Sequence, residues 1–168
     1  IVARETFEMA GCTISDIDAL DLYSCFPSAV QIACDEMGIP LDDPRGLTIT
    51  GGLPYFGGPG NNYVTHSIAE MMNKVRAQPG IKGLVTANGN YITKQSAGIY
   101  STEPLPKLFS PKDPSAYQVE INTQKGPVFS EYVEGNAIIE TYTIMHDREG
   151  PSFGIIFGRL NNGKRFVA

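Results

Sequence analysis

The chain has 168 residues, 42% hydrophobic and 18% charged, a composition typical of a folded soluble protein with a core of its own. Thirteen basic against eighteen acidic residues give a net charge of −5, which argues against a DNA- or RNA-binding surface. No apolar run approaches about 18 residues, and no basic segment precedes a shorter one, so we expect neither a membrane span nor a signal peptide but a cytoplasmic protein.

Three cysteines, Cys12, Cys25 and Cys34, are an odd number and lack the spacing of metal ligands. Each lies in a mostly apolar context, so we expect free thiols and no metal site. The chain begins at Ile1, and its last residues, KRFVA, have the pattern of a strand interior. We therefore expect this sequence to be a piece of a longer protein.

The opening segment alternates between helical and extended patterns. Apolar residues at helical spacing before Gly11 predict a helix that ends at this glycine. Residues 17–26 are predicted to form a strand. Residues 28–38 are predicted to form a helix, with Ser28 as its N-cap and Gly38 at its end.

The pattern continues beyond this helix. Residues 47–52 predict a short strand, 81–89 a further strand, and 96–102 a strand beside it. Between them, 62–77 predicts a helix whose core-facing stripe is Val64, Ile68, Met71, Met72 and Val75. Strands that alternate with helices of this length predict a layered α/β/α fold around a mixed sheet.

Residues 103–127 differ in character, since they hold five of the twelve prolines and no sustained helical or strand periodicity. We interpret 106–127 as a connecting arm between a half-domain, 1–105, and a β extension, 128–168.

The β extension has the pattern of an antiparallel meander. Strands are predicted over 137–145 and 152–160, and the Asn162-Gly163 pair predicts a hairpin turn into the last strand. Three strands with two apolar faces are not expected to be stable alone. We therefore expect downstream strands to close the meander into a small β-barrel.

The loop GGLPYFGGPGNN, residues 51–62, holds five glycines and two prolines. It lacks the Lys and hydroxyl residue of a P-loop, and its glycines do not have dinucleotide-fingerprint spacing. Two readings stay open. The loop delivers a helix N-terminus that holds an anion or a developing oxyanion, or Asn61 or Asn62 caps that helix and the loop is a structural turn. The residues of the first reading are Gly57, Gly58, Gly60, Asn61 and Asn62.

Four segments in order resemble the C-terminal half of the thiolase superfamily, in particular sterol-carrier-protein-type thiolases and thiolase-like proteins. They are ETFEMAGCTISDIDALDLYSCF, GGLPYFGGPGNNYVTHSIAEM, GLVTANGNY and SAGIYSTEP. The family carries an N-E-A-F or H-D-C-F motif on a strand, a G-H-P loop before a helix, and a C-x-G loop before its last strand. The resemblance covers residues 1–105.

The resemblance implies an acetyl-CoA acetyltransferase-type protein that makes or breaks a carbon–carbon bond next to a CoA thioester. This reaction needs a nucleophilic thiolate, a second thiol that moves the α-proton, and donors at the thioester oxygen. The family takes the nucleophile from its N-terminal half, which these residues do not include. The implied partners are that half or a second copy of the chain, and the implied ligand is CoA or an acyl-CoA, with no covalently bound cofactor.

Each motif departs from the family pattern. Tyr23 stands where the family has Asn or His, Gly58 stands where it has the His of G-H-P, and the segment with Asn88 and Tyr91 has no cysteine. Cys25 lacks a neighbouring base. His66 is the remaining candidate for the missing imidazole, although it lies further along its helix and fits a residue of the polar face better. We therefore expect the chain alone to be inactive and its pocket to be vestigial, with positions Tyr23, Cys25, Gly58, Asn88 and Tyr91.

Two function classes follow, an acyl-CoA-handling protein of impaired activity and a non-catalytic scaffold that docks another protein. The resemblance also implies a five-stranded sheet whose first strand precedes residue 1. We expect another chain, a strand exchange or a rearrangement to fill its place.

Overall fold

The computed structural model describes residues 1–105 and 110–168, so residues 106–109 of the predicted arm lie outside the described residues. The chain divides into two compact units, Ile1–Lys112 and Asp113–Ala168. No helix in the described ranges has the length and apolar character needed to cross a membrane.

The first unit is built on a mixed three-stranded sheet. Strand β1 (Ala19–Asp21) pairs in parallel with β2 (Lys82–Gly89), and β2 pairs antiparallel with β3 (Lys94–Ser101). Leu20 lies opposite Leu84 in the first pair. The predicted strands at 81–89 and 96–102 and their pairing are confirmed.

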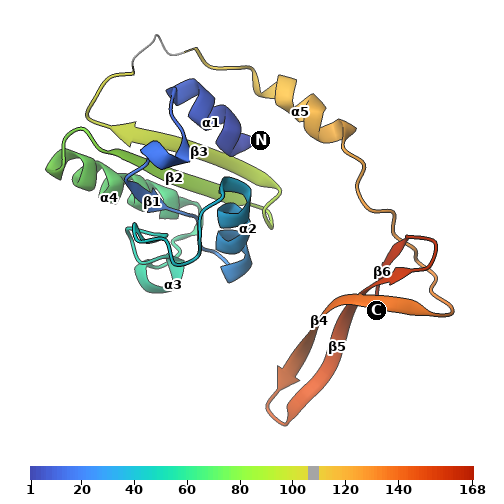
Figure 1. The fold of residues 1–168 in the computed structure, drawn as a ribbon. Helices are drawn as coiled ribbons and strands as arrows, with labels where there is room; N and C mark the ends of the chain where they lie inside the picture. Colours follow the sequence, from blue (N-terminus) through green and yellow to red (C-terminus); the bar gives the residue numbers. More distant parts are fainter. Residues whose placement is uncertain (106–109) are drawn as a thin grey trace. The chain divides into compact units, whose positions relative to one another are not determined.

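Helices cover both faces of this sheet (Figure 1), as neighbouring positions of β1 show. Leu20 packs in a cluster with residues of α1 (Val2–Ala10) and α2 (Pro27–Met37), whereas Ala19 packs with residues of α4 (Tyr63–Ala77). Alternate strand residues point to opposite faces, so the two clusters are separate cores. The expected α/β/α layering and the apolar stripe of the 62–77 helix are confirmed.

Helix α1 ends as predicted at Gly11, which has φ +65° and closes the helix through its backbone amide. The N-cap prediction for α2 is wrong. This helix begins at Pro27 after Phe26 and has no side-chain cap hydrogen bond, so Ser28 lies inside its first turn. Proline at the first helical position fixes φ and loses no intrahelical hydrogen bond. The predicted end at Gly38 is confirmed, with φ +67°.

Two strand predictions need correction. The strand expected over 17–26 is limited to Ala19–Asp21, and residues 47–52 form no strand. Leu22 still makes one backbone hydrogen bond there, because its amide donates to Leu47 O at 2.9 Å. Beyond it the amides of Ile49 and Thr50 donate to the Asp21 side chain instead of to a neighbouring strand. Hydrogen bonds to the Asp21 carboxylate thus take the place of the backbone hydrogen bonds between strands that would make this segment a strand.

The direct pairing of β1 with β2 bears on the expected missing strand. In the first unit β1 and β2 are hydrogen-bonded neighbours. This pairing is compatible with a rearrangement of the sheet, one of the three ways in which we expected the place of the missing strand to be filled. Strand supply by another chain stays a prediction.

The second unit begins with helix α5 (Pro114–Thr123), which the sequence analysis missed because it treated 106–127 as an arm without helix. The Asp113 side chain accepts a hydrogen bond from the Ser115 amide at 2.9 Å, and Pro114 occupies the first helical position. These are ordinary helix-start features.

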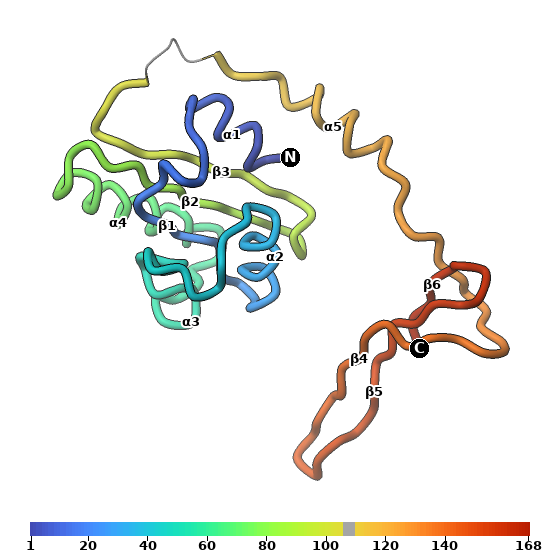
Figure 2. Tube along the Cα trace, in the orientation of Figure 1, coloured from blue at the N-terminus to red at the C-terminus, as the bar shows by residue number. Residues whose placement is uncertain are grey.

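The rest of this unit is the predicted antiparallel meander (Figure 2), with β4 (Ala137–Asp147), β5 (Gly150–Leu160) and β6 (Arg165–Val167). In the described residues it is an open three-stranded sheet and not a closed barrel. Every residue of β4 is exposed. Glu140, at a break in the β4–β5 register, forms ion pairs with Arg159 and Arg165.

Candidate functional site

The segment after β1 carries the first two candidate residues. The Tyr23 amide donates to Thr86 Oγ1 on β2 at 2.9 Å, and its ring meets the Tyr63 ring edge-on, with centroids 5.5 Å apart. Burial, with smaller contributions from Cys25 and Tyr63, raises the pKa of Tyr23 above its ordinary value of 10.0. The phenol is therefore neutral at pH 7 and cannot act as a general base there.

Cys25 follows the end of β1 and contacts Asn88, which lies near the end of β2. The Cys25 thiol donates to Asn88 Oδ1 across 3.4 Å. An amide oxygen accepts this hydrogen bond but is no base, so the contact orients the sulfur without activating it. Three of the positions predicted to form a vestigial pocket, Tyr23, Cys25 and Asn88, thus lie at the carboxyl ends of β1 and β2.

The glycine-rich loop contains local structure that the sequence analysis did not predict. Helix α3 (Leu53–Phe56) begins after Gly52, and the Leu53 amide donates to Ser24 Oγ at 3.0 Å. Gly52 has φ +88°, a conformation that favours glycine, and a Cβ there would lie only 3.0 Å from the same oxygen. The loop is therefore docked on the segment that carries Tyr23 and Cys25.

The glycines proposed to bind a ligand follow α3. Gly57 has φ +95° and ends the helix, while Gly60 has φ +58° and begins the 3-10 turn η2 (Gly60–Asn62). Gly58 is exposed, and a Cβ there would lie 3.5 Å from Leu53 Cδ2, an ordinary contact. Within 1–105 and 110–168, the Gly58 amide has no hydrogen-bond acceptor. The position that carries a histidine in the resemblance thus offers a free N–H.

The asparagines of the loop do not cap α4 through their side chains. Asn62 is the N-cap residue but makes no side-chain cap hydrogen bond, and Asn61 is exposed in η2. Instead, Asn62 Nδ2 lies 3.5 Å from His66 Nε2. The His66 ring also lies 5.3 Å from the Phe56 ring, on the loop side of α4.

Tyr91 lies in a strained turn between β2 and β3. Asn90, Tyr91 and Ile92 have φ values of +48°, +54° and +70°, a region that residues other than glycine rarely enter. The Tyr91 side chain is 88% exposed, and its ring stacks on Phe26 at 6.5 Å. The Tyr91 ring therefore lies near the start of α2. A phenol at this place does not supply the thiol with which the family moves the α-proton.

One residue at this end of the sheet escaped the sequence analysis. Asp21, the last residue of β1, is fully buried and accepts hydrogen bonds from the backbone of Ile49 and Thr50 and from three hydroxyls. The sequence did contain a signal for this residue, because Asp21 is charged and lies within the apolar run ALDL. A strand buried on both faces tolerates a carboxylate only where all of its hydrogen bonds are made. The hydroxyls belong to Thr50, Tyr63 and Ser67.

Two open depressions on the first unit lie away from these residues. Pro40 and Arg45 line one, and Phe7 and Cys12 line the other. Neither is lined by the positions predicted to form a vestigial pocket. The part of the chain that the structure describes holds no group of three residues that could bind a metal ion.

Comparisons with known proteins identify both units. No curated protein matches the chain. Residues 117–168 match the family described as the thiolase-like protein type 1 additional C-terminal domain. Over 98% of its length the chain is similar to the crystal structure of a monomeric SCP2-thiolase like protein type 1 from Mycobacterium smegmatis, with 47% sequence identity and a TM-score of 0.86.

That match covers 36% of the Mycobacterium smegmatis chain, so these residues span about a third of the length of this relative. The match extends over the mixed sheet, the glycine-rich loop and the meander, since only 2% of the chain lies outside it. The chain is therefore a thiolase-like protein with the additional C-terminal domain of this family.

Proposed function

We propose that this chain is the acyl-CoA-handling half of a thiolase-like protein, which binds a CoA thioester and does not itself carry out the acetyl-CoA acetyltransferase reaction. The observation that carries this proposal is the free amide of Gly58, in the loop whose Leu53 amide is hydrogen-bonded to Ser24, between Tyr23 and Cys25. The N-terminal thiolase half or a second copy of the chain would complete the site. Because CoA thioesters are intracellular metabolites, the proposal includes a cytoplasmic location.

The groups present suit binding better than turnover. A backbone N–H aimed at a thioester oxygen stabilises the partial negative charge on that oxygen. Proton transfer from the α-carbon needs a base, yet Tyr23 is a neutral phenol and the Cys25 thiol is bonded to an amide oxygen. Losing one oxyanion donor alone costs about 100- to 1,000-fold in rate, and a missing base costs a similar factor.

Calorimetry of the protein with CoA and acetyl-CoA tests the proposal, with two variants at Gly58. Gly58→Ala keeps the N–H and adds a methyl group in ordinary contact with Leu53, whereas Gly58→Pro removes the N–H. Gly57 has ψ 151°, a conformation compatible with a following proline. We expect acetyl-CoA to bind the wild type and the alanine variant alike and the proline variant about tenfold more weakly, the loss of one hydrogen bond.

Two results would contradict the proposal. Absence of any heat with acetyl-CoA would show that the protein does not bind this ligand. Equal affinity of the alanine and proline variants would show that the Gly58 amide does not contribute to binding. Circular dichroism of the two variants controls for their folding.

The second unit supports a different candidate function, the docking of another protein on the β extension. Ile138, Tyr142 and Phe153 of β4 and β5 are 68%, 67% and 59% exposed, and large apolar side chains in this number are typical of contact surfaces. In this case the protein gives no heat with CoA or acetyl-CoA. Replacing Ile138 and Tyr142 by serine would then abolish association with the partner and leave the first unit folded.

A further inference from the structure

We infer that Asp21 is a positioning residue that fixes both ends of the glycine-rich loop through one buried carboxylate. The loop is the segment between Thr50 and Tyr63. Its ordering by Asp21 is independent of any ligand, whereas the consequence for affinity rests on the proposed function.

One oxygen of Asp21 holds the entrance of the loop. Asp21 Oδ2 accepts the backbone amides of Ile49 and Thr50, each at 3.1 Å, and the Thr50 hydroxyl at 2.8 Å. Thr50 Oγ1 in turn accepts the Gly52 amide at 3.2 Å. The carboxylate is therefore connected to Gly52 of the loop through a single hydroxyl.

The other oxygen holds the exit of the loop. Asp21 Oδ1 accepts the Ser67 hydroxyl at 2.9 Å and the Tyr63 hydroxyl at 3.3 Å, and both residues belong to the start of α4. The hydroxyls of Thr50 and Tyr63 lie 2.6 Å apart, which joins the entrance to the exit. Every group around the carboxylate is thus a donor, and one side chain of β1 ties together two segments that flank the loop.

This role follows from what the loop lacks. Residues 47–52 form no strand, so no sheet ladder fixes the entrance, and four glycines of the loop have positive φ. Glycines lose much conformational entropy on ordering, and an ordered loop of this composition needs fixed ends. Asp21, Ser67 and Tyr63 are fully buried, so water cannot replace a lost contact there.

Asp21→Asn tests the inference, because asparagine has the shape of aspartate but replaces one acceptor oxygen by an NH2 group. This NH2 group cannot accept the hydrogen bonds that the surrounding amides and hydroxyls donate. Hydrogen exchange read by mass spectrometry compares loop peptides over 50–62 with β2–β3 peptides over 82–101, to which Asp21 is joined through its backbone alone and not through its carboxylate. We expect exchange to rise about tenfold or more in the loop and less than about twofold in the strands, as for a local opening. Equal acceleration in both, or no change in the loop, would overturn the inference.

A second variant decides the matter where Asp21→Asn does not fold. Thr50→Val removes the hydroxyl that links Asp21, Tyr63 and Gly52 and keeps the backbone contacts. Thr48→Val is its matched control, since Thr48 makes no contact with Asp21 in the described part of the chain. We expect Thr50→Val, and not Thr48→Val, to speed exchange in the loop alone.

Binding of acetyl-CoA to the same variants separates this inference from the proposed function. Where the wild type binds, we expect the variant with a loosened loop to bind about tenfold more weakly, because ordering the loop then opposes binding. Unchanged affinity with a loosened loop would overturn the consequence for affinity. Where the wild type does not bind, the proposed function fails, and the exchange data still decide whether Asp21 positions the loop.

Discussion

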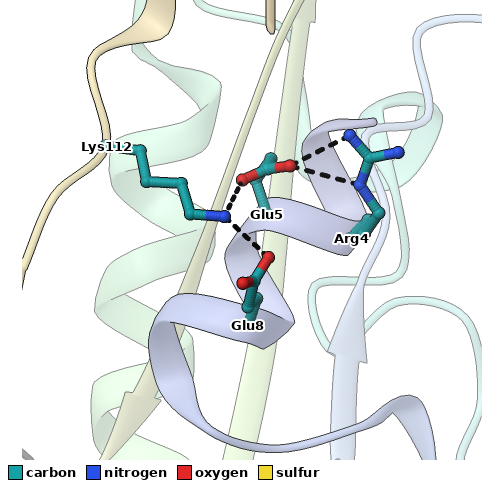
Figure 3. Close-up of polar contacts among 4 residues, drawn as sticks. All are labelled: Arg4, Glu5, Glu8 and Lys112. Atoms are coloured by element: carbon teal, nitrogen blue, oxygen red, sulfur yellow. Dashed lines mark hydrogen bonds and ion pairs between the residues drawn. The ribbon is translucent and has the colours of Figure 1, made fainter. Parts of the chain in front are cut away.

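The Lys112 ammonium lies 2.8 Å from a carboxylate oxygen of Glu5, although 107 positions separate the two residues (Figure 3). It also lies 2.7 Å from Glu8, one turn further along α1, and Arg4 contacts Glu5 at 3.0 Å. The last residue of the first unit is therefore held on the opening helix. These contacts lower the pKa of Glu5, with Lys112 as the largest cause, and raise the pKa of Lys112.

Lys112→Met is expected to raise the pKa of Glu5 while leaving it below the ordinary value of 4.5, because Arg4 remains. The lowered Glu5 pKa adds stability above pH 4.5, which is lost as pH falls through the folded value. The raised Lys112 pKa adds stability below pH 10.5, which is lost as pH rises through its folded value.

An NMR titration of the Glu5 carboxyl carbon measures this change. Lys94→Met, at an exposed lysine of β3, is the matched control and should leave the titration unchanged. A Glu5 pKa that is the same with and without Lys112 would show that the contact does not form in solution.

Arg45 and Asp43 predict a second acid-sensitive contact. The Arg45 guanidinium donates to both carboxylate oxygens of Asp43 and to the backbone oxygens of Ile14 and Ile17. The side-chain hydrogen bonds from Arg45, together with the one from its backbone amide, lower the pKa of Asp43 from 3.8 to about 2. A lowered pKa stabilises the fold above pH 3.8, and this contribution is lost as pH falls toward about 2.

Asp43→Asn is therefore expected to lower the Tm at pH 7 by about 2 to 8 °C and to have little effect near pH 2. Asp42→Asn, at the exposed neighbouring carboxylate, is the control for the loss of one negative charge. Thermal unfolding followed by circular dichroism over this pH range measures both variants. A constant difference between Asp43→Asn and wild type at all pH values would contradict the ion pair as its cause.

Elements with strong local signals were predictable from the sequence. The stripe of α4 repeats at helical spacing, and Gly11 and Gly38 end their helices in the left-handed conformation that glycine favours. Helix α5 also had local signals, the Asp113 cap followed by Pro114, but the prolines around it led to the interpretation as an arm.

The remaining errors concern contacts that are distant in the sequence. Residues 47–52 have the composition of a strand, yet their amides bond to Asp21, which lies 28 positions before Ile49. Local sequence periodicity does not predict a contact between residues so far apart in the sequence. The structure places Tyr23, Cys25 and Asn88 at one end of the sheet, and their role in a pocket stays a prediction. Motif matching could not reveal the contacts of Asp21 beside the neighbouring loop.

A close approach between Gly83 and Met71 predicts a coupled pair of substitutions. A Cβ on Gly83 of β2 would overlap the sulfur of Met71 and lie 2.8 Å from its Cγ, and Met71 is fully buried. Gly83→Ala is expected to cost about 1–3 kcal/mol by overpacking, and Met71→Ala about 2–5 kcal/mol by leaving a cavity. The double variant should lose less than the sum, because the new methyl group occupies part of that cavity.

Urea unfolding of the four proteins gives this cycle directly. Leu84→Ala combined with Gly83→Ala serves as a control, because Leu84 lies on the same strand but packs in the other core and not with Met71. Additive losses for Gly83 and Met71 would show that the helix moves away from the sheet instead of repacking.

The turn between β2 and β3 predicts a substitution that stabilises the chain. Ile92 is β-branched and has φ +70°, which costs about 1–2 kcal/mol relative to a residue without this clash. Glycine removes the clash but adds entropy to the unfolded chain, so Ile92→Gly should stabilise by a net amount of about 0.5–1 kcal/mol. Thr93→Gly is the matched control and should destabilise, because the Thr93 hydroxyl donates to Asn90 O at 2.7 Å. Denaturant midpoints that fall in both variants would mean that the turn does not store strain at Ile92.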